Sequence, residues 1–153
     1  MCIIIDNCVF GSVFFEKNRE HSNFKPVKDW IMLREGKVVY GGTHYKRELP
    51  LSYLRHLKTL SDKRKTIPLP DKEVDNYENN LKKYFPQKKF NDPHIVAMAL
   101  ISECRLLCTN DNDFLKFIRD KDIYISAKKR PKVYKNLMHT HLLKPVNVPT
   151  KYL

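Results

Sequence analysis

Ile3-Ile4-Ile5-Asp6 is a run of three β-branched residues that ends in a carboxylate. A short, continuous apolar run of this kind is typical of a strand buried on both faces of a parallel sheet. A second such run, Leu106-Leu107-Cys108, leads directly into Thr109-Asn110-Asp111. Both stretches therefore predict buried strands with acidic side chains at or just beyond their carboxyl ends.

Short apolar segments and amphipathic segments alternate along the rest of the chain. Strands are expected at residues 3–5, 38–40, 66–69, 106–108 and 123–125. Helices are expected over residues 9–16 and from residues 26, 43, 71, 92 and 114, with a loop at 21–24 and an interruption at Pro50. This alternation indicates an α/β fold, a three-layer α/β/α sandwich with a central, mostly parallel sheet. In such sheets the functional site lies at the carboxyl ends of the strands, near the point where the strand order reverses.

The composition is that of one globular domain. The chain has 153 residues, of which 42% are hydrophobic and 30% are charged, which excludes disorder throughout. No apolar run approaches the roughly 18–20 residues that a membrane helix needs, and Asp6 interrupts the first run too early for a secretory signal. We therefore expect a cytoplasmic protein with no membrane partner, whose four cysteines are thiols. Cys104 and Cys108 lack a second ligand pair at zinc spacing, so a zinc site is not expected.

The net charge of +12 is unevenly distributed. Residues 126–153 contain seven Lys and Arg and no acidic residue, and no core-forming segment is expected beyond Ile125. We accordingly divide the chain into a domain at 1–125 and a basic C-terminal extension at 126–153. The charge is consistent with a solvated basic surface or with binding to a phosphate backbone. The residues expected to bind such a substrate are Lys46, Arg47, Lys128, Lys129 and Arg130.

Acidic side chains gather at the positions that this topology brings to one edge of the sheet. Asp6 ends the first strand, Asp92 begins a helix, and Asp111 and Asp113 follow a later strand, while Glu48 lies early in the helix that Thr43 opens. Carboxylates that converge in a cleft repel one another unless a positive group lies between them. Hard divalent cations with oxygen ligands, Mg²⁺ or Mn²⁺, match such a site.

Each of these residues also has a simpler interpretation. Asp6 could end a strand, Asp92 could cap a helix, Asp111 and Asp113 could cap the next helix, and Glu48 could be a solvated helix residue. Capping does not explain why so many carboxylates should meet at one edge of the sheet. Two histidines near these acids have simpler interpretations as well, because His44 is expected at the surface and His94 partly buried in a helix.

A metal cleft in a basic protein indicates metal-dependent hydrolysis of phosphodiester bonds, in which the cations polarise the phosphate and activate a water. The basic surroundings would hold the polyanion. The alternative is a nucleic-acid-binding module that does not cut and that binds through the basic C-terminal extension.

Four motifs in this order resemble the PIN domain family. They are Ile-Ile-Ile-Asp6, Tyr40-Gly-Gly-Thr43 with Glu48-Leu49, Asp92-Pro-His-Ile-Val-Ala-Met-Ala99 and Cys108-Thr-Asn-Asp-Asn-Asp-Phe114, and the resemblance spans residues 2–125. It implies a PIN-like α/β/α sandwich and an Mg²⁺- or Mn²⁺-dependent endoribonuclease that uses a metal-activated water. It also implies RNA as substrate and raises three further expectations: the toxin of a toxin–antitoxin pair, an antitoxin protein as partner, and a homodimer.

The resemblance also implies roles for individual residues. Asp6, Glu48, Asp92 and Asp111 would be catalytic and would bind the metal, with Asp113 as a fifth metal ligand. Thr109 and Asn7 would support the site. The family commonly places a small hydroxyl residue directly after its first aspartate, whereas this chain has Asn7 followed by Cys8.

Overall fold

The computed structural model of this chain describes residues 1–86, 92–123 and 129–144. Within these ranges five strands form one sheet in the order β3-β2-β1-β4-β5, and every neighbouring pair is parallel. The strands are β1 (Cys2–Ile5), β2 (Lys37–Tyr40), β3 (Thr66–Pro68), β4 (Leu106–Cys108) and β5 (Lys132–Tyr134). The predicted α/β fold with a parallel sheet is confirmed.

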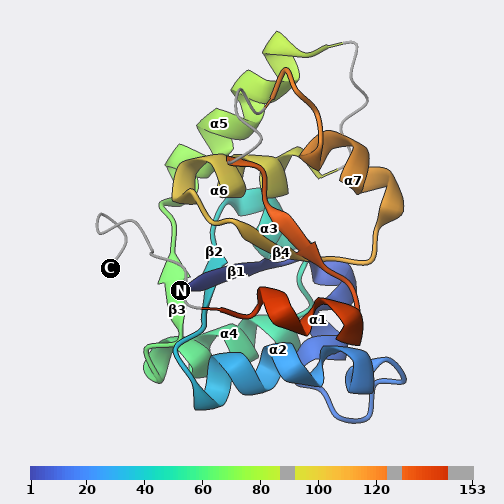
Figure 1. The fold of residues 1–153 in the computed structure, drawn as a ribbon. Helices are drawn as coiled ribbons and strands as arrows, with labels where there is room; N and C mark the ends of the chain where they lie inside the picture. The colour runs from blue at the N-terminus through green and yellow to red at the C-terminus, as the bar shows by residue number, and fades with distance from the viewer. Residues whose placement is uncertain (87–91, 124–128, 145–153) are drawn as a thin grey trace.

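Helices cover both faces of this sheet (Figure 1). On one face α5 and α6 pack together and α3 contacts both, while on the other α1 packs against α2 and the 3₁₀ helix η2 also contacts α2. The helices are α1 (Asn7–Phe14), α2 (His21–Leu33), α3 (Thr43–Glu48), α4 (Leu51–Asp62), α5 (Asp71–Tyr84), α6 (Pro93–Ser102), α7 (Asn112–Ile118) and η2 (Leu137–Leu142). Among the described residues no helix has the length and hydropathy to cross a bilayer.

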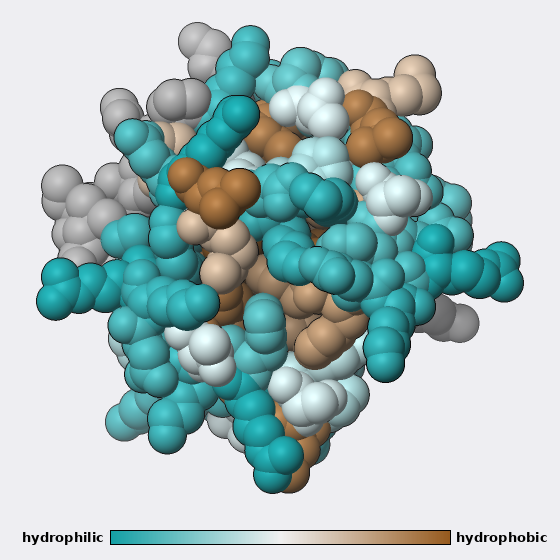
Figure 2. All heavy atoms as spheres, turned by 90° about the horizontal axis from the view of Figure 1, so that it is seen from below, coloured by the Kyte–Doolittle hydropathy of each residue, from teal (hydrophilic) through white to brown (hydrophobic). Residues whose placement is uncertain are grey.

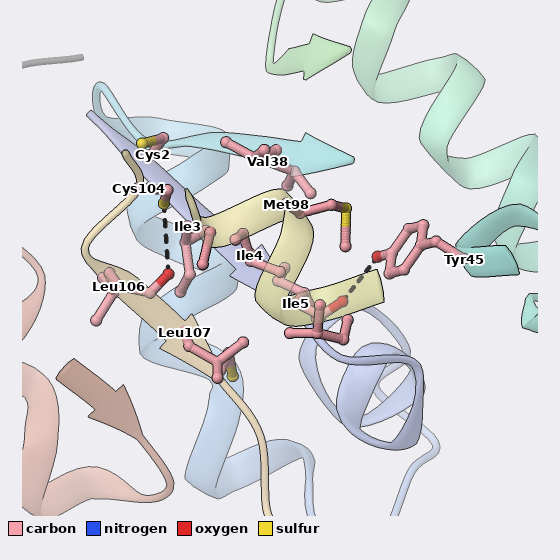
Figure 3. Packing of buried hydrophobic residues seen from close by; sticks show 14 of the residues in the cluster. Cys2, Ile3, Ile4, Ile5, Val38, Tyr45, Met98, Cys104, Leu106 and Leu107 are labelled. Carbon is pink, nitrogen blue, oxygen red and sulfur yellow. Dashed lines mark hydrogen bonds between the residues drawn. The ribbon is translucent and has the colours of Figure 1, made fainter. Parts of the chain in front are cut away.

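β1 lies at the centre of the core. Ile3, Ile4 and Ile5 are fully buried, as expected for a strand with neighbours on both sides and helices on both faces. Met98 of α6 lies against this strand (Figure 3). α6 is buried on nearly every side, which is why its sequence shows almost no polar stripe.

On the face of the sheet that α1 and α2 cover, aromatic side chains pack between α1 and α4. The ring of Phe10 stacks on Tyr53 with centroids 4.8 Å apart, and Phe14 lies 4.6 Å from the ring of His56. Figure 2 shows the molecule from this side, where apolar groups gather in a central hollow within a hydrophilic rim. The homodimer that the resemblance implies stays a prediction.

The sheet extends beyond residue 125, where the sequence indicated that core-forming segments end. β5 pairs with β4, with Val133 opposite Leu107. Tyr134 is fully buried, and its hydroxyl donates a hydrogen bond to the carbonyl of Asn23 in α2 at 2.9 Å. The strand expected at 123–125 is not seen, because residue 123 lies in a turn and residues 124–125 are outside the described residues. Part of the basic extension is thus an edge of the sheet.

One helix boundary differs from the sequence-based expectation, and one expected interruption is confirmed. Residues 21–24, expected as a loop, form the first turn of α2, because Phe24 is buried and His21 Nδ1 bonds to the carbonyl of Ser12 at 2.9 Å. At Pro50 the expected interruption divides the segment from residue 43 into two helices, α3 and α4. Proline cannot donate the backbone hydrogen bond that would continue α3.

A candidate metal centre at the carboxyl edge of the sheet

β1 and β4 are neighbours, and the strand order reverses between them, so their carboxyl ends form the switch point of the sheet. Asp6 follows β1, and its backbone N–H donates to the carbonyl of Cys108 at 2.9 Å. The Asp6 carboxylate is buried and accepts a hydrogen bond from Thr109 Oγ1 at 2.7 Å. Asp6 stands at the N-cap of α1, yet its side chain makes no capping hydrogen bond. Its carboxylate is therefore held at the switch point without being used as a cap.

The hydroxyl of the same residue, Thr109, connects Asp111 to Asp6. Its backbone N–H donates to Thr109 Oγ1 at 3.1 Å. Its Oδ1 accepts from the N–H groups of Asp113 and Phe114 at 2.9 and 3.2 Å, so Asp111 also caps α7. The capping interpretation thus applies to Asp111, and the cap fixes its carboxylate beside the switch point.

Asp92 brings a third carboxylate from the start of α6. Its backbone is left-handed, with φ 55° and ψ 51°, and its side chain makes no capping hydrogen bond. Burial together with the negative charges of Asp6, Glu48 and Asp111 raises the pKa of Asp92 to about 6. These four carboxylates therefore lie close enough to repel one another, and we refer to Asp6, Glu48, Asp92 and Asp111 as the carboxylate cluster.

Glu48 enters the cluster from the end of α3. This helix is fixed to β1 because the buried hydroxyl of Tyr45 donates to the carbonyl of Ile5 at 2.7 Å (Figure 3). Asn7 Nδ2 donates to Glu48 Oε2 at 3.1 Å. Asn7 thus holds a member of the cluster, the kind of supporting position that the sequence indicated.

Two histidines and a second glutamate extend the cluster, and the sequence did not single them out as ligands. His44 bonds through Nε2 to Glu48 Oε1 at 3.0 Å and through Nδ1 to Glu78 Oε1 at 2.8 Å. Burial opposes the ionisation of Glu78, but hydrogen bonds from His44 and Lys82 hold its pKa below the usual value. Both histidines sit one turn or less from a predicted acid, which is the signal that could have found them. Glu78 comes from α5, and nothing in the local sequence marks it.

His94 is the deepest of these groups. Its side chain is fully buried, its ring centroid lies 4.0 Å from that of His44, and its Nε2 lies 3.2 Å from Glu48 Oε2. Burial lowers the pKa of His94 to about 3, so the imidazole is neutral at neutral pH. His94, which the sequence predicted to be partly buried in a helix, is therefore fully buried.

The remaining predicted site residues lie apart from the cluster. Asp113 is exposed, and the contact recorded for its carboxylate is with Lys116 at 3.7 Å. Lys46 pairs with Asp71 at 2.7 Å, and Arg47 is exposed on α3. The structure thus brings together the four expected carboxylates and leaves Asp113 outside their contacts.

Cys8 is the second residue after Asp6 and lies beside Thr109 and Asn110. Its Sγ donates to Asn110 Oδ1 at 3.1 Å and lies 3.7 Å from Thr109 Oγ1. Although Cys8 lies at the surface, desolvation of the thiol and the charge of Asp6 raise its pKa to about 12. Without a bound cation the Cys8 thiol therefore stays protonated at neutral pH and serves as a weak hydrogen-bond donor.

The donor atoms of the cluster suit a divalent cation. Ligand atoms of Glu48, Asp92 and His94 all lie within 4.8 Å of one another, and so do those of His44, Glu78 and His94. Asp6 and Asp111 belong to neither group, but their charges act on Asp92. Carboxylates forced together, one of them with a raised pKa, are relieved by a cation between them.

A basic groove of about 1040 Å³ runs along β5 and η2. It begins at Arg130, before β5, and continues to Lys135, whose Nζ donates to Asn112 Oδ1 beside Asp111. The cationic residues that line it are Arg105, Arg119, Arg130, Lys132, Lys135 and Lys144, together with His139 and His141. No described residue that lines it is acidic. No residue of the carboxylate cluster lines this groove, and the hydrogen bond of Lys135 to Asn112, next to Asp111, connects the two.

The predicted substrate-binding residues of the extension are only partly in this groove. Arg130 lines it, but Lys129 lies in a separate, smaller pocket beside Glu103 and Tyr77. Lys128 lies outside the described residues.

Comparison with protein-family models, curated proteins and solved structures found no match.

Proposed function

We propose that this protein is a metal-dependent endoribonuclease related to the PIN domain family, which hydrolyses RNA phosphodiester bonds at the carboxylate cluster. The observation that carries the proposal is the convergence of four carboxylates from four separate segments at the switch point of a parallel sheet, where burial and the three neighbouring carboxylates raise the pKa of Asp92 to about 6. Mg²⁺ or Mn²⁺ would be held by Asp6, Glu48, Asp92 and Asp111. When bound, such a cation polarises the phosphate and lowers the pKa of the attacking water.

The residues of the chain have separate parts in this reaction. Asp6 is held rigidly by Thr109, and Glu48 is held by Asn7 and His44, so neither carboxylate has to reorganise when substrate binds. With a pKa of about 6, Asp92 is mostly ionised at neutral pH and is available as a ligand. Such preorganisation is what a reaction with developing charge requires.

The polyanion would lie in the basic groove. Six Lys and Arg side chains line it, and Lys135 at its end is bonded to the residue that follows Asp111. A single strand of RNA bound there would be directed toward the cluster, and its backbone would be attracted electrostatically whatever its sequence. We infer a cytoplasmic enzyme on this basis, and an antitoxin protein that blocks the cluster remains a prediction from the resemblance.

The decisive test compares Asp6→Asn with the parent protein on a mixed-sequence single-stranded RNA, in EDTA, Mg²⁺ and Mn²⁺. We expect cutting only with metal, and a fall of about 10³-fold or more in the variant, because electrostatic groups aimed at the reacting atoms commonly contribute that much. Asp62→Asn is the matched control, since Asp62 is an exposed aspartate at the end of α4. Cutting by Asp6→Asn at the parental rate would refute the assignment of the site.

The basic groove also favours a second candidate, a nucleic-acid-binding protein that does not cut. The two functions separate in the same experiment if RNA binding is measured alongside cleavage. A binder would hold RNA equally with and without divalent metal, and Asp6→Asn would bind more tightly because a negative charge is removed. A nuclease would show cleavage that disappears with EDTA.

A further inference from the structure

His94 is the feature of the site that the proposed reaction does not use. Its imidazole is fully buried, and its Nε2 lies 3.2 Å from Glu48 Oε2 in a geometry that does not make a hydrogen bond. Within the part of the chain that the structure describes, neither of its ring nitrogens has a hydrogen-bond partner. A buried polar group without a partner is destabilising, so such groups are rare unless something binds them.

The surroundings of His94 supply the other donors of a cation site. Ligand atoms of Glu48, Asp92 and His94 lie within 4.8 Å of one another, so one ion can contact all three. Glu48 is oriented from behind by His44, which is itself bonded to Glu78. A carboxylate–histidine pair that fixes the direction of a metal ligand is a common feature of metal sites.

We propose that Glu48, Asp92 and His94 form a cation position with a nitrogen donor, which binds a divalent first-row transition ion in preference to Mg²⁺. The reason is the chemistry of the donor. Mg²⁺ takes oxygen ligands and water and gains little from imidazole, whereas imidazole is a good ligand for transition ions. Asp6 and Asp111 offer only oxygen donors, so the part of the cluster that they form has no nitrogen donor. The proposal deepens the proposed function, since it identifies the metal of the same cleft, but metal binding can be tested without any cleavage.

The test uses the full chain with Mn²⁺ as the probe. Pulsed electron paramagnetic resonance of the bound Mn²⁺ should show modulation from a directly coordinated imidazole nitrogen. Calorimetric titration should show that Mn²⁺ still binds when Mg²⁺ is in excess. In His94→Gln the nitrogen signal should disappear and Mn²⁺ affinity should fall about 10- to 100-fold, the range seen when the ligand environment of a metal is altered. Mg²⁺ affinity should change far less.

His56→Gln is the matched control. His56 also has a buried ring nitrogen with no hydrogen-bond partner in the described residues, but it packs against Phe14 on the other face of the sheet. This variant should keep both the nitrogen signal and the Mn²⁺ affinity.

The parent protein alone can overturn the proposal, so the result does not depend on whether His94→Gln folds. Bound Mn²⁺ without a nitrogen signal, or no Mn²⁺ binding, would refute it. If the parent cuts RNA but shows no nitrogen signal, the proposed function stands and this inference fails. If the signal is present but no RNA is cut, the inference stands and the proposed function fails.

Discussion

The surroundings of the Asp92 side chain oppose its ionisation. Burial and the charges of Asp6, Glu48 and Asp111 raise its pKa from 3.8 to about 6. The folded protein therefore retains a proton that the unfolded chain releases between these two values. The contribution of protonated Asp92 to the free energy of unfolding is therefore fully present at low pH. It is lost as the pH rises through about 6, the pKa of Asp92 in the folded protein.

Asp92→Asn should therefore stabilise the protein at pH 7.5 in EDTA. The expected gain is about 1–2 kcal/mol, somewhat less than the roughly 3 kcal/mol that a shift of this size represents. Asparagine tolerates the left-handed backbone of this position, so the substitution introduces no strain. Urea unfolding at pH 4.5 and 7.5 measures the effect, with Asp62→Asn as the control. A loss of stability in Asp92→Asn at pH 7.5 would contradict the repulsion that we describe.

Three of the four carboxylates stand at positions that the sequence marks. Asp6 and Asp111 follow apolar strands, and Asp92 precedes a proline at the start of a helix. His94 is marked only by its closeness to Asp92, and Glu78 could not be found in the same way because its role depends on how α5 packs against α3 and α6. Asp113 was expected in the cluster because it is close to Asp111 in sequence, but it lies on the first turn of α7 and is exposed there.

Among the elements, β5 is the strand that the sequence did not predict. Lys132-Val133-Tyr134 has two apolar residues among basic ones, so it reads as part of a charged tail. As an edge strand it needs only one partner, β4, and one buried side chain, Tyr134, to be held in place. The strands in the middle of the sheet were visible because they are buried on both faces and therefore continuously apolar.

Tyr134 should thus contribute to stability as a core residue does. Tyr134→Ala is expected to lower the free energy of unfolding by about 3–5 kcal/mol, as for other large buried aromatic side chains. Tyr134→Phe should lose about 1 kcal/mol, the contribution of the hydrogen bond to Asn23. Urea denaturation would measure both.

Tyr84→Ala provides the comparison, because Tyr84 is 71% exposed at the end of α5. This variant should be close to neutral. If Tyr134→Ala were equally neutral, residues 132–134 would not belong to the folded sheet.

At the scale of the whole molecule, the net charge of +12 is unevenly distributed. The basic groove is lined by Lys and Arg side chains and by no described acidic residue. A groove of this kind should bind RNA more strongly than the same number of charges elsewhere. The comparison needs two sets of substitutions that remove equal charge from exposed positions. In Asp6→Asn, which should bind RNA without cutting it, the two sets can be tested directly.

The groove set replaces Arg119, Lys132 and Lys144 by Gln, and the control set replaces Arg55 and Lys58 on α4 and Lys63 at its C-cap. We expect the groove set to weaken RNA binding and to reduce the dependence of log K on log salt by roughly 2, since each lost phosphate contact on a single strand contributes about 0.7. Fluorescence anisotropy at several salt concentrations measures this slope. Equal effects of the two sets would show that overall charge, not the groove, attracts the RNA.

The strand order also determines when the protein can become active during its synthesis. β1 is made first, but its neighbour β4 is synthesised much later, and β4 in turn is covered at its edge only by β5. Asp6 therefore has no partner threonine until β4 has emerged from the ribosome, and the groove has no wall until residue 134 has followed. A growing chain with this topology cannot assemble the carboxylate cluster or the basic groove early in translation, so the RNA cleavage that we propose could not begin before β5 has been made.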